Sequence, residues 1–296
     1  MATAATLSST PAAAPTTTSH DNPATRPITS IPRGPVPTTL TYYSPPVDGS
    51  SPFNYVETPP PGQRQRNYTE SPHAVTVSDA RGQESRFSTD EHGFALLTNV
   101  PVSAEREFVD DASIAANYYP EVDALLRKEL GADRVVIFDH TIRRSQVGAK
   151  RAPVNRVHID QTAKAARQRV QRHAPEDAER LLEGRVRIVN VWRPLNGPVV
   201  SSPLAMADSN SVSDDAVVPV EHRYPDRTGE TAGIKAEEGH RWWYWSGMGN
   251  EERILLQCYD SKLGKRVAHT AFTDKRTEGP EWRGRESIEV RALVFG

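Results

Sequence analysis

The chain has 296 residues, with 36 Lys and Arg against 38 Asp and Glu, so its formal net charge is -2 at pH 7. This balance argues against a general nucleic-acid-binding protein, which needs a basic surface for phosphates. Its longest apolar stretches, such as residues 253–259, are far shorter than the roughly 20 residues of a membrane-spanning helix. The first basic residue is Arg26 and no apolar leader precedes it, so we expect a cytoplasmic protein.

The N-terminal residues 1–37 consist mainly of Ala, Thr, Ser and Pro and carry only three charged side chains, Asp21, Arg26 and Arg33. Such a segment buries too little apolar surface to offset the entropy cost of ordering it, so we expect a disordered tail. Residues 38–296 are expected to form a single domain. Residues 38–86 remain rich in Pro, Gly and Tyr, which predicts extended and loop structure on the surface of that domain.

Two helical regions are expected. Residues 111–130 place apolar side chains on one helical face and end at Gly131, and Pro120 is expected to kink the helix or split it in two. A second region, about residues 162–183, is rich in Ala, Arg and Glu and is interrupted by Pro175. It predicts a helical hairpin or insertion.

The remaining elements are short strands rich in Val, Ile, Trp, Tyr and Phe and separated by turn residues. We expect them at residues 134–139, 153–159, 185–195, 241–246, 253–259, 267–272 and 287–295. Without a repeating β-α-β order, they predict a mainly β fold, a barrel or sandwich buttressed by helices. The single cysteine, Cys258, lies within an apolar run and is expected to be a buried core thiol.

A candidate metal site combines His158 and Asp160, two residues apart on an extended segment, with the distant His269. Alternate residues of a strand point to the same side, so the first two can reach one ion. Two His and one carboxylate leave three coordination positions open, as in non-haem Fe(II) oxygenases. Arg285 and Ser287 on the last strand can bind the far carboxylate of a dicarboxylic acid.

Several long strings carry a family resemblance: TLTYY (39–43), RNYTESPH (66–73), IFDHTIRR (137–144), NRVHIDQ (155–161), NVWRPL (190–195), EHRYP (221–225) and RESIEVR (285–291). With these strings the chain resembles the fungal iron- and 2-oxoglutarate-dependent oxygenases grouped with gibberellin GA4 desaturase and the AsaB-type hydroxylase/desaturases. The similarity extends from about residue 38 to residue 295.

The resemblance implies a double-stranded β-helix (jelly-roll, cupin-like) core. It implies Fe(II), 2-oxoglutarate and O2 as cofactor and co-substrates, with His158, Asp160 and His269 as iron ligands and Arg285 with Ser287 gripping 2-oxoglutarate. The implied reaction is hydroxylation, desaturation or oxidative ring closure at a C–H bond of a small secondary metabolite or amino-acid-derived molecule. It is coupled to decarboxylation of 2-oxoglutarate to succinate.

The spacing departs from the wider oxygenase superfamily in two places. Asp160 and His269 are separated by 108 residues, which insertions at residues 162–182 and 201–238 can explain. Arg285 lies 16 residues beyond His269, slightly further than usual, which leaves Arg291 open as an alternative carboxylate clamp. Arg285 is favoured because Ser287 accompanies it, whereas Arg291 can equally pair with Glu289.

The substrate site and the reaction class leave alternatives open. Arg143, Arg144 and Arg193 are candidates for binding an anionic substrate group, or they form structural salt bridges. Two other functions compete with the oxygenase: a metal-dependent hydrolase or isomerase that uses the same triad, and a non-catalytic metabolite-binding jelly-roll protein. We expect a small-molecule substrate and neither nucleic-acid nor membrane partners, and we leave a homo-oligomer open.

Overall fold

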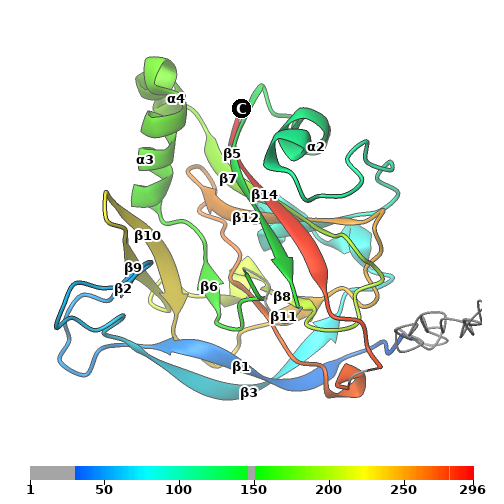
Figure 1. Cartoon of the computed structure of the whole chain (residues 1–296), viewed down its shortest axis with the longest axis horizontal. Coiled ribbons are helices and arrows are strands. Elements are labelled where there is room, and N and C mark those ends of the chain that lie inside the picture. Colours follow the sequence, from blue (N-terminus) through cyan, green and yellow to red (C-terminus); the bar gives the residue numbers. More distant parts are fainter. Residues whose placement is uncertain (1–30, 146–150, 280) are drawn as a thin grey trace, which may run out of the picture.

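A computed structural model describes residues 31–145, 151–279 and 281–296 (Figure 1). Most of the expected tail, residues 1–30, lies outside this part of the chain. The strands are β1 Val36–Ser44, β2 Phe53–Tyr55, β3 Thr69–Asp79, β4 Phe94–Leu97, β5 Arg134–Arg144, β6 His158–Ile159, β7 Val186–Pro194, β8 Leu204–Ala207, β9 Val217–Arg223, β10 Thr228–Ile234, β11 Trp242–Tyr244, β12 Arg253–Asp260, β13 His269–Ala271 and β14 Glu286–Phe295. The helices are α1 Thr89–His92, α2 Asp111–Leu130, α3 Ala163–His173 and α4 Ala178–Glu183, with short 3₁₀ turns η1 Glu84–Arg86, η2 Pro175–Asp177, η3 Ser209–Ser211 and η4 Lys275–Thr277.

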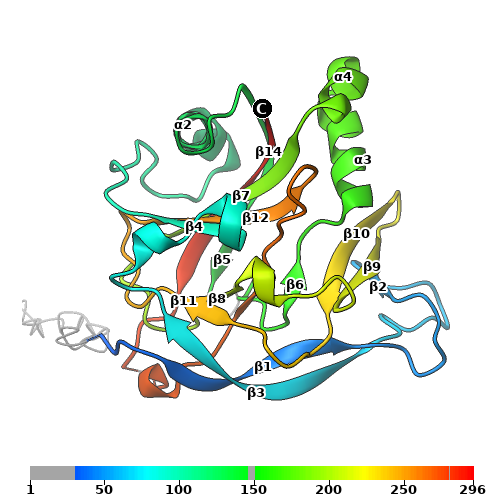
Figure 2. The same cartoon turned by 180° about the vertical axis from the view of Figure 1, so that it is seen from behind.

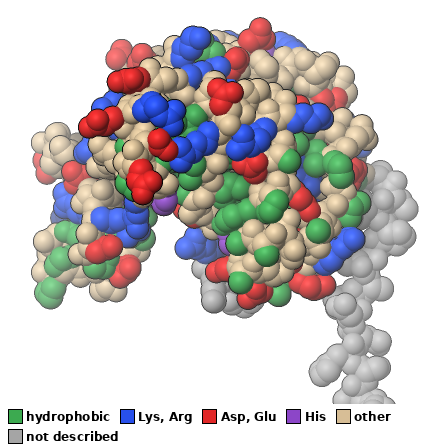
Figure 3. Space-filling view, turned by 90° about the horizontal axis from the view of Figure 1, so that it is seen from above, with side chains coloured by type: hydrophobic (Ala, Val, Ile, Leu, Met, Phe, Trp, Pro, Cys, Tyr) green, Lys and Arg blue, Asp and Glu red, His purple; other side chains and the backbone are tan. Residues whose placement is uncertain are grey.

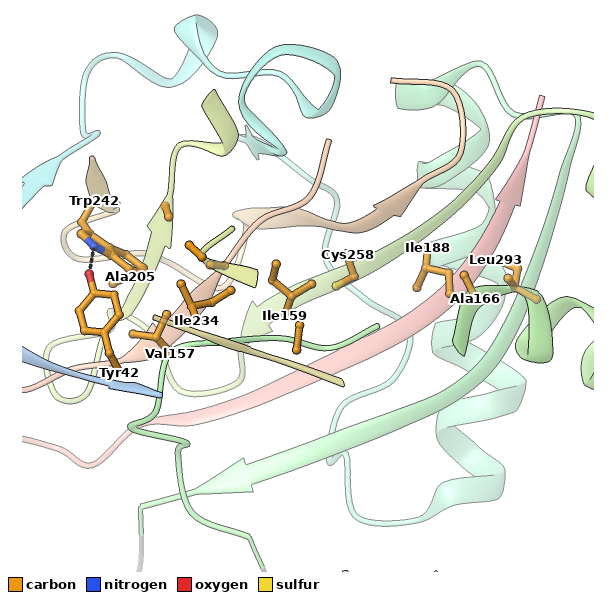
Figure 4. Packing of buried hydrophobic residues seen from close by; sticks show 14 of the residues in the cluster. Tyr42, Val157, Ile159, Ala166, Ile188, Ala205, Ile234, Trp242, Cys258 and Leu293 are labelled. Atoms are coloured by element: carbon orange, nitrogen blue, oxygen red, sulfur yellow. Dashed lines mark hydrogen bonds between the residues drawn. The ribbon is translucent and has the colours of Figure 1, made fainter. Parts of the chain in front are cut away.

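The strands form two sheets that face each other across a common core. The nine-stranded sheet has the order β1-β3-β11-β8-β13-β6-β10-β9-β2, and the five-stranded sheet has the order β4-β12-β7-β14-β5. Buried side chains from both sheets, including Ala205, Trp242, Ile188 and Leu293, belong to one hydrophobic cluster (Figure 4). This arrangement confirms the mainly β fold with flanking helices and the jelly-roll core that the resemblance implied.

Helix α2 covers the outer face of the five-stranded sheet (Figures 1 and 2). The Asp110 side chain caps its start by accepting a hydrogen bond from the Ser113 N–H, and Gly131 ends it in the left-handed conformation at φ 62°. Its bounds confirm the prediction, but Pro120 lies inside one continuous helix, so the expected split is wrong. The side chains that it buries are spaced three or four residues apart: Ile114, Tyr118, Val122 and Leu126.

Successive side chains of β14 point to opposite faces of the five-stranded sheet. Ile288, Val290, Ala292 and Val294 pack in the cluster beneath α2. The intervening polar residues of β14 therefore point to the opposite face, which looks toward the nine-stranded sheet. Neighbouring β7 pairs with β14 without interruption and follows the same alternation. β5 does so as well, apart from one register shift opposite Arg291 and Ala292.

Two segments expected outside the core supply strands to the larger sheet. β1 and β3, from the stretch predicted as extended and loop structure on the surface, pair along the whole of β1 and bury Leu40, Tyr42 and Val77. Residues 201–238, expected as a polar insertion, contribute β8, β9 and β10, and β8 lies between β11 and β13. Thr, Pro and Gly interrupt the alternation of apolar and polar residues in these segments, so the sequence pattern does not identify the strands. Pairing with neighbouring strands stabilises them in the sheet.

The helical region at residues 162–183 is confirmed as α3 and α4, joined by η2 (Figures 1 and 2). Ala166 and Val170 of α3 and Leu181 of α4 are buried in the cluster shared by the two sheets. Cys258 is a fully buried free thiol in the same cluster, as predicted. Trp242, which donates a 2.8 Å hydrogen bond from its indole N–H to the Tyr42 hydroxyl, also packs in the core (Figure 4).

Among the described helices, none combines the length and the apolar character needed to cross a membrane.

We expect Gly233→Ala to destabilise the fold. Gly233 of β10 lies opposite His158 of β6, and a Cβ at this position would come within 2.8 Å of the Tyr43 ring. Such overpacking typically costs about 1–3 kcal/mol, measurable as a lower melting temperature. Gly229→Ala on the same strand is the matched control, because its Cβ would make an ordinary 3.6 Å contact with Tyr224. Equal melting temperatures for the two variants would contradict this prediction.

Candidate metal centre

Three side chains from two strands and the loop that follows one of them meet between the sheets. His158 of β6 and His269 of β13 are directly opposite each other in the antiparallel pair, and their ring centroids lie 4.5 Å apart. Asp160 follows β6 on the same side as His158. One ligand atom from each residue lies within 4.8 Å of the other two, which is a separation that a single ion can bridge.

The hydrogen bonds of the two imidazoles leave one nitrogen of each free for a metal. His158 Nδ1 lies 2.7 Å from the Arg156 carbonyl oxygen, and His269 Nδ1 lies 3.3 Å from the Val267 carbonyl oxygen. A carbonyl can only accept, so Nδ1 carries the proton and Nε2 offers a lone pair. Both Nε2 atoms face the same carboxylate oxygen, Asp160 Oδ1, at 3.2 and 3.9 Å.

Burial and neighbouring charge set the protonation states that metal binding requires. Burial lowers the pKa of His269, with a further contribution from His158, so its imidazole is neutral at pH 7. Burial opposes ionisation of Asp160, but His158 and the guanidinium of Arg291 outweigh it and hold the pKa of this carboxyl well below its usual range. The site therefore presents a neutral His269 imidazole and an ionised Asp160 carboxylate. Together with the His158 imidazole they form the donor set suited to Fe(II).

The second oxygen of Asp160 is held by protein groups. Oδ2 accepts a 2.8 Å hydrogen bond from the Asn190 side-chain amide on β7 and a 3.3 Å one from Arg291 Nε. Oδ1 therefore remains directed at the two imidazoles. Outer hydrogen bonds of this kind orient a metal ligand and raise affinity for the ion.

Arg291 is occupied by other side chains on the inner face. Besides Asp160, its guanidinium contacts Asp139 at 2.7 Å and Glu289 at 2.8 Å, and it also donates to Thr141. All its donor nitrogens thus have protein partners. These contacts agree with the pairing to Glu289 considered from the sequence and leave it no free edge for a co-substrate carboxylate.

Arg285, in contrast to Arg291, has no carboxylate partner among the described residues. It is 3 % exposed, donates from Nη1 to the Ser202 carbonyl at 2.5 Å, and lies over the Trp192 ring at 5.3 Å. Its Nε is buried and has no hydrogen-bond partner among the described residues. Burial, and then the positive charge of Arg143, lower the pKa of Arg285 to about 9. A bound carboxylate would relieve both penalties.

The triad and Arg285 line one inner cavity, together with Ser287, Trp192 and Leu204. Thr141, Arg143 and Asp160 line this cavity and also a larger outer cleft, about 2250 Å³ including its open mouth. The outer cleft runs between β5, α3 and the β9–β10 hairpin. Figure 3 shows the molecule hollowed between a lobe at the left and the main body, with Lys and Arg side chains near the hollow.

Only one of the three arginines predicted to bind substrate lies in these cavities. Arg143 of β5 lines both. Arg144, the next residue, points to the opposite face, where it pairs with Glu286 at 2.8 Å. Arg193 of β7 is buried on that same outer face, over the rings of Phe108 and Tyr118 at 5.0 and 5.4 Å. Successive side chains of a strand point to opposite faces of the sheet, which places Arg143 on the inner face and Arg144 and Arg193 on the outer face. The sequence prediction did not take this alternation into account for β5 and β7.

Comparisons with known proteins support one family. Residues 40–295 match the family model described as "Oxidoreductase/YMDC permease-like domain". The chain is 37% identical over 253 residues to the Fe(II)/2-oxoglutarate-dependent dioxygenase nvfI of Aspergillus novofumigatus, covering 82% of this chain and 90% of that protein. It is 34% identical to the hydroxylase/desaturase poxK of Penicillium oxalicum, covering 95% of this chain and 97% of that one.

A solved structure agrees with these sequence matches. The iron and alpha-ketoglutarate-dependent endoperoxidase NvfI superposes with a TM-score of 0.81 at 33% identity, covering 89% of this chain and 98% of that chain. The chain belongs to the fungal Fe(II)/2-oxoglutarate-dependent dioxygenase and hydroxylase/desaturase family. This dioxygenase is therefore an oxidoreductase whose family uses Fe(II), 2-oxoglutarate and O2, and its His-Asp-His cluster has the donor set for the iron.

Several residues around the dioxygenase site were not predicted from the sequence. Asn190 is a fully buried amide in a strand that is otherwise largely apolar, and this anomaly was a signal that could have found it. Trp192 lines the inner cavity, whereas the Trp242–Trp245 run packs mainly in the cores. His173 and His222, left without a role, line the outer cleft, and no spacing in the sequence relates them to the triad.

We expect Asn190→Ala to weaken Fe(II) binding by the dioxygenase by about 10- to 100-fold, because it removes the donor that fixes Asp160 Oδ2. The measurement is an anaerobic Fe(II) titration. Asn210→Ala is the control, since this amide bonds to Asp208 and to the Glu91 carbonyl, outside the metal centre. An unchanged Fe(II) affinity in Asn190→Ala would show that Asp160 needs no such support.

Proposed function

We propose that this dioxygenase oxidises a C–H bond of a small secondary metabolite or amino-acid-derived molecule. In this proposal His158, Asp160 and His269 hold Fe(II), and Arg285 with Ser287 holds 2-oxoglutarate. The observation that carries it is a single inner cavity lined both by the triad and by a buried arginine that has no carboxylate partner among the described residues. A metal-dependent hydrolase takes no dicarboxylate co-substrate for such an arginine to bind.

The protein groups have distinct tasks in this reaction. Fe(II) with 2-oxoglutarate supplies an O2-driven oxidation of a C–H bond, coupled to decarboxylation of 2-oxoglutarate to succinate. The Arg285 guanidinium receives the distal carboxylate of the co-substrate, and the buried Ser287 hydroxyl donates to the same group. Their position on the inner face fixes the direction in which the keto-acid end approaches the triad.

The apolar part of the cavity wall limits access of water. Trp192 and Leu204 are buried and line the inner cavity beside the ligands. Excluding water strengthens the electrostatic interactions of the co-substrate and protects reactive intermediates from side reactions. The substrate then enters through the outer cleft, and Arg143 lies where this cleft meets the inner cavity.

The position of the substrate decides the outcome: hydroxylation, desaturation or ring closure. Relatives named as hydroxylase/desaturase and as endoperoxidase support such variation on one scaffold. The cytoplasmic location, the single domain from residue 38 to 296, a homo-oligomer, and the lack of nucleic-acid or membrane partners stay predictions.

The experiment is an anaerobic titration of the purified protein with Fe(II) and then with 2-oxoglutarate. We expect the weak visible charge-transfer band of the iron–2-oxoglutarate chelate, and we expect succinate to form once O2 is admitted. Zn(II) in place of Fe(II) is the control and gives no band. Fe(II) binding without a band would contradict the 2-oxoglutarate assignment and would favour the hydrolase.

A further inference from the structure

The outer cleft carries a local excess of positive charge in a protein whose formal net charge is -2. Three acidic residues, Asp139, Asp160 and Glu230, line it. Six arginines line it: Arg143, Arg151, Arg169, Arg172, Arg227 and Arg291. Such a concentration of one sign in a concave site attracts ligands of the opposite charge.

The three carboxylates of the cleft are already bound within the protein. Asp139 pairs with Arg291, and Asp160 accepts from Arg291 and Asn190. Glu230 accepts from the Thr162 hydroxyl and lies 3.3 Å from the Lys164 ammonium. Among the described residues none of the three forms an ion pair with Arg169 or Arg172, although the charge of Asp139 still acts on Arg169.

Arg169 of α3 stands out among these arginines. Its side chain is partly buried and its guanidinium lies over the Phe138 ring at 4.7 Å, which fixes its position in the cleft. Among the described residues it has neither a hydrogen bond nor an ion pair. Burial lowers the pKa of Arg169; the negative charge of Asp139 opposes this effect, and the positive charges of Arg291 and Arg172 add to it. A guanidinium held in this way gains most from an anionic partner.

The cleft-lining arginines of helix α3 lie on one face of the helix. Ala165, Gln168, Arg169 and Arg172 line the cleft, and their spacing of three or four residues places them side by side along the helix. Two like charges at this spacing repel each other unless an anion lies between them. Gln168 adds an amide that can donate to the same anion.

We propose that the substrate of this dioxygenase bears an oxyanion, a carboxylate or a phosphate, that is bound in the outer cleft by Arg169 and Arg172. This inference rests on the proposed function, because it assigns the cleft to the substrate of the iron site. The oxyanion anchors one end of the substrate on α3, and the rest extends past Arg143 toward the triad. The two arginines are thus specificity-determining residues, distinct from Arg285, which belongs to the co-substrate.

The test measures binding of three probes of similar size: benzoate, phenyl phosphate and the neutral benzamide. Calorimetric titrations use the metal-free protein and the protein saturated anaerobically with Fe(II) and 2-oxoglutarate. The variants are Arg169→Gln, Arg169→Lys and Arg167→Gln. Arg167 is the matched control, because it lies on the same helix, is exposed and does not line the cleft.

We expect at least one anionic probe to bind wild-type protein more tightly than benzamide, and we expect Arg169→Gln to weaken it about 10-fold. Arg169→Lys keeps part of this affinity, and Arg167→Gln keeps all of it. The tighter of the two anions identifies the carboxylate or the phosphate. Benzamide binding as tightly as both anions, or anion affinity unchanged in Arg169→Gln, overturns the inference. If the iron–2-oxoglutarate band is missing while anions still bind through Arg169, the proposed function fails and the anion site stands.

Discussion

Replacing His158 or His269 by alanine abolishes turnover and lowers Fe(II) affinity by more than the roughly 10- to 100-fold that a supporting residue contributes. In the proposed site each imidazole supplies one of three protein ligand atoms, and both Nε2 atoms lie near Asp160 Oδ1. No other group of three His, Cys, Asp or Glu side chains in the described residues could hold a metal in their place. The measurement is iron content after anaerobic loading and desalting, together with the charge-transfer band.

The matched control is His73→Ala, because His73 is an exposed histidine on β3, outside both cavities. It should bind Fe(II) like the wild-type protein. Near-stoichiometric iron and an intact band in both triad variants would show that the ion binds elsewhere. A melting temperature measured without metal separates loss of a ligand from loss of the fold.

Arg285→Gln raises the 2-oxoglutarate concentration needed for half-maximal turnover by about 100-fold and leaves Fe(II) affinity unchanged. Removing one partner of a buried, hydrogen-bonded charge pair costs about 2–5 kcal/mol. Arg285 is buried, carries an unpartnered Nε and faces the inner cavity, whereas Ser287 on the same face remains to bind weakly. The checks are the KM for 2-oxoglutarate and the midpoint of the band in a 2-oxoglutarate titration.

Arg291→Gln is the informative comparison. Because Arg291 contacts Asp160, Asp139 and Glu289, its loss should reduce Fe(II) affinity and stability without a selective effect on 2-oxoglutarate. If only Arg291→Gln weakened the binding of 2-oxoglutarate, Arg291 and not Arg285 would be assigned to its carboxylate.

The sequence predicted those helices and strands whose own residues show a clear hydrophobic pattern. Helix α2 was predictable from its apolar face and Gly131, and β7, β12 and β14 from their apolar runs. The segments around β1 and β8 were not, because their pairing depends on strands far away in the chain. Pro120 was expected to kink or split α2; the split is wrong, because one helix continues through it with its apolar face packed on the sheet.

The residues of the candidate site also differ in whether the sequence alone could identify them. The triad and Arg285 with Ser287 could be proposed because their residue types and order are informative without coordinates. Arg143 and Arg144 could not be distinguished, since their difference is the face of β5 that each occupies. Arg169 could not be chosen among many arginines until α3 was placed beside β5.

An ion held by His158 and His269, as proposed, would cross-link segments more than one hundred residues apart. β6 is only two residues long and lies between β13 and β10, so few backbone hydrogen bonds of its own hold it there. A ligand that binds only the native state stabilises it by mass action, by about 2.7 kcal/mol at a free concentration of 100 times Kd. We therefore expect a protease to digest the metal-free form faster than the Fe(II)-loaded form, because the metal-free form opens more often.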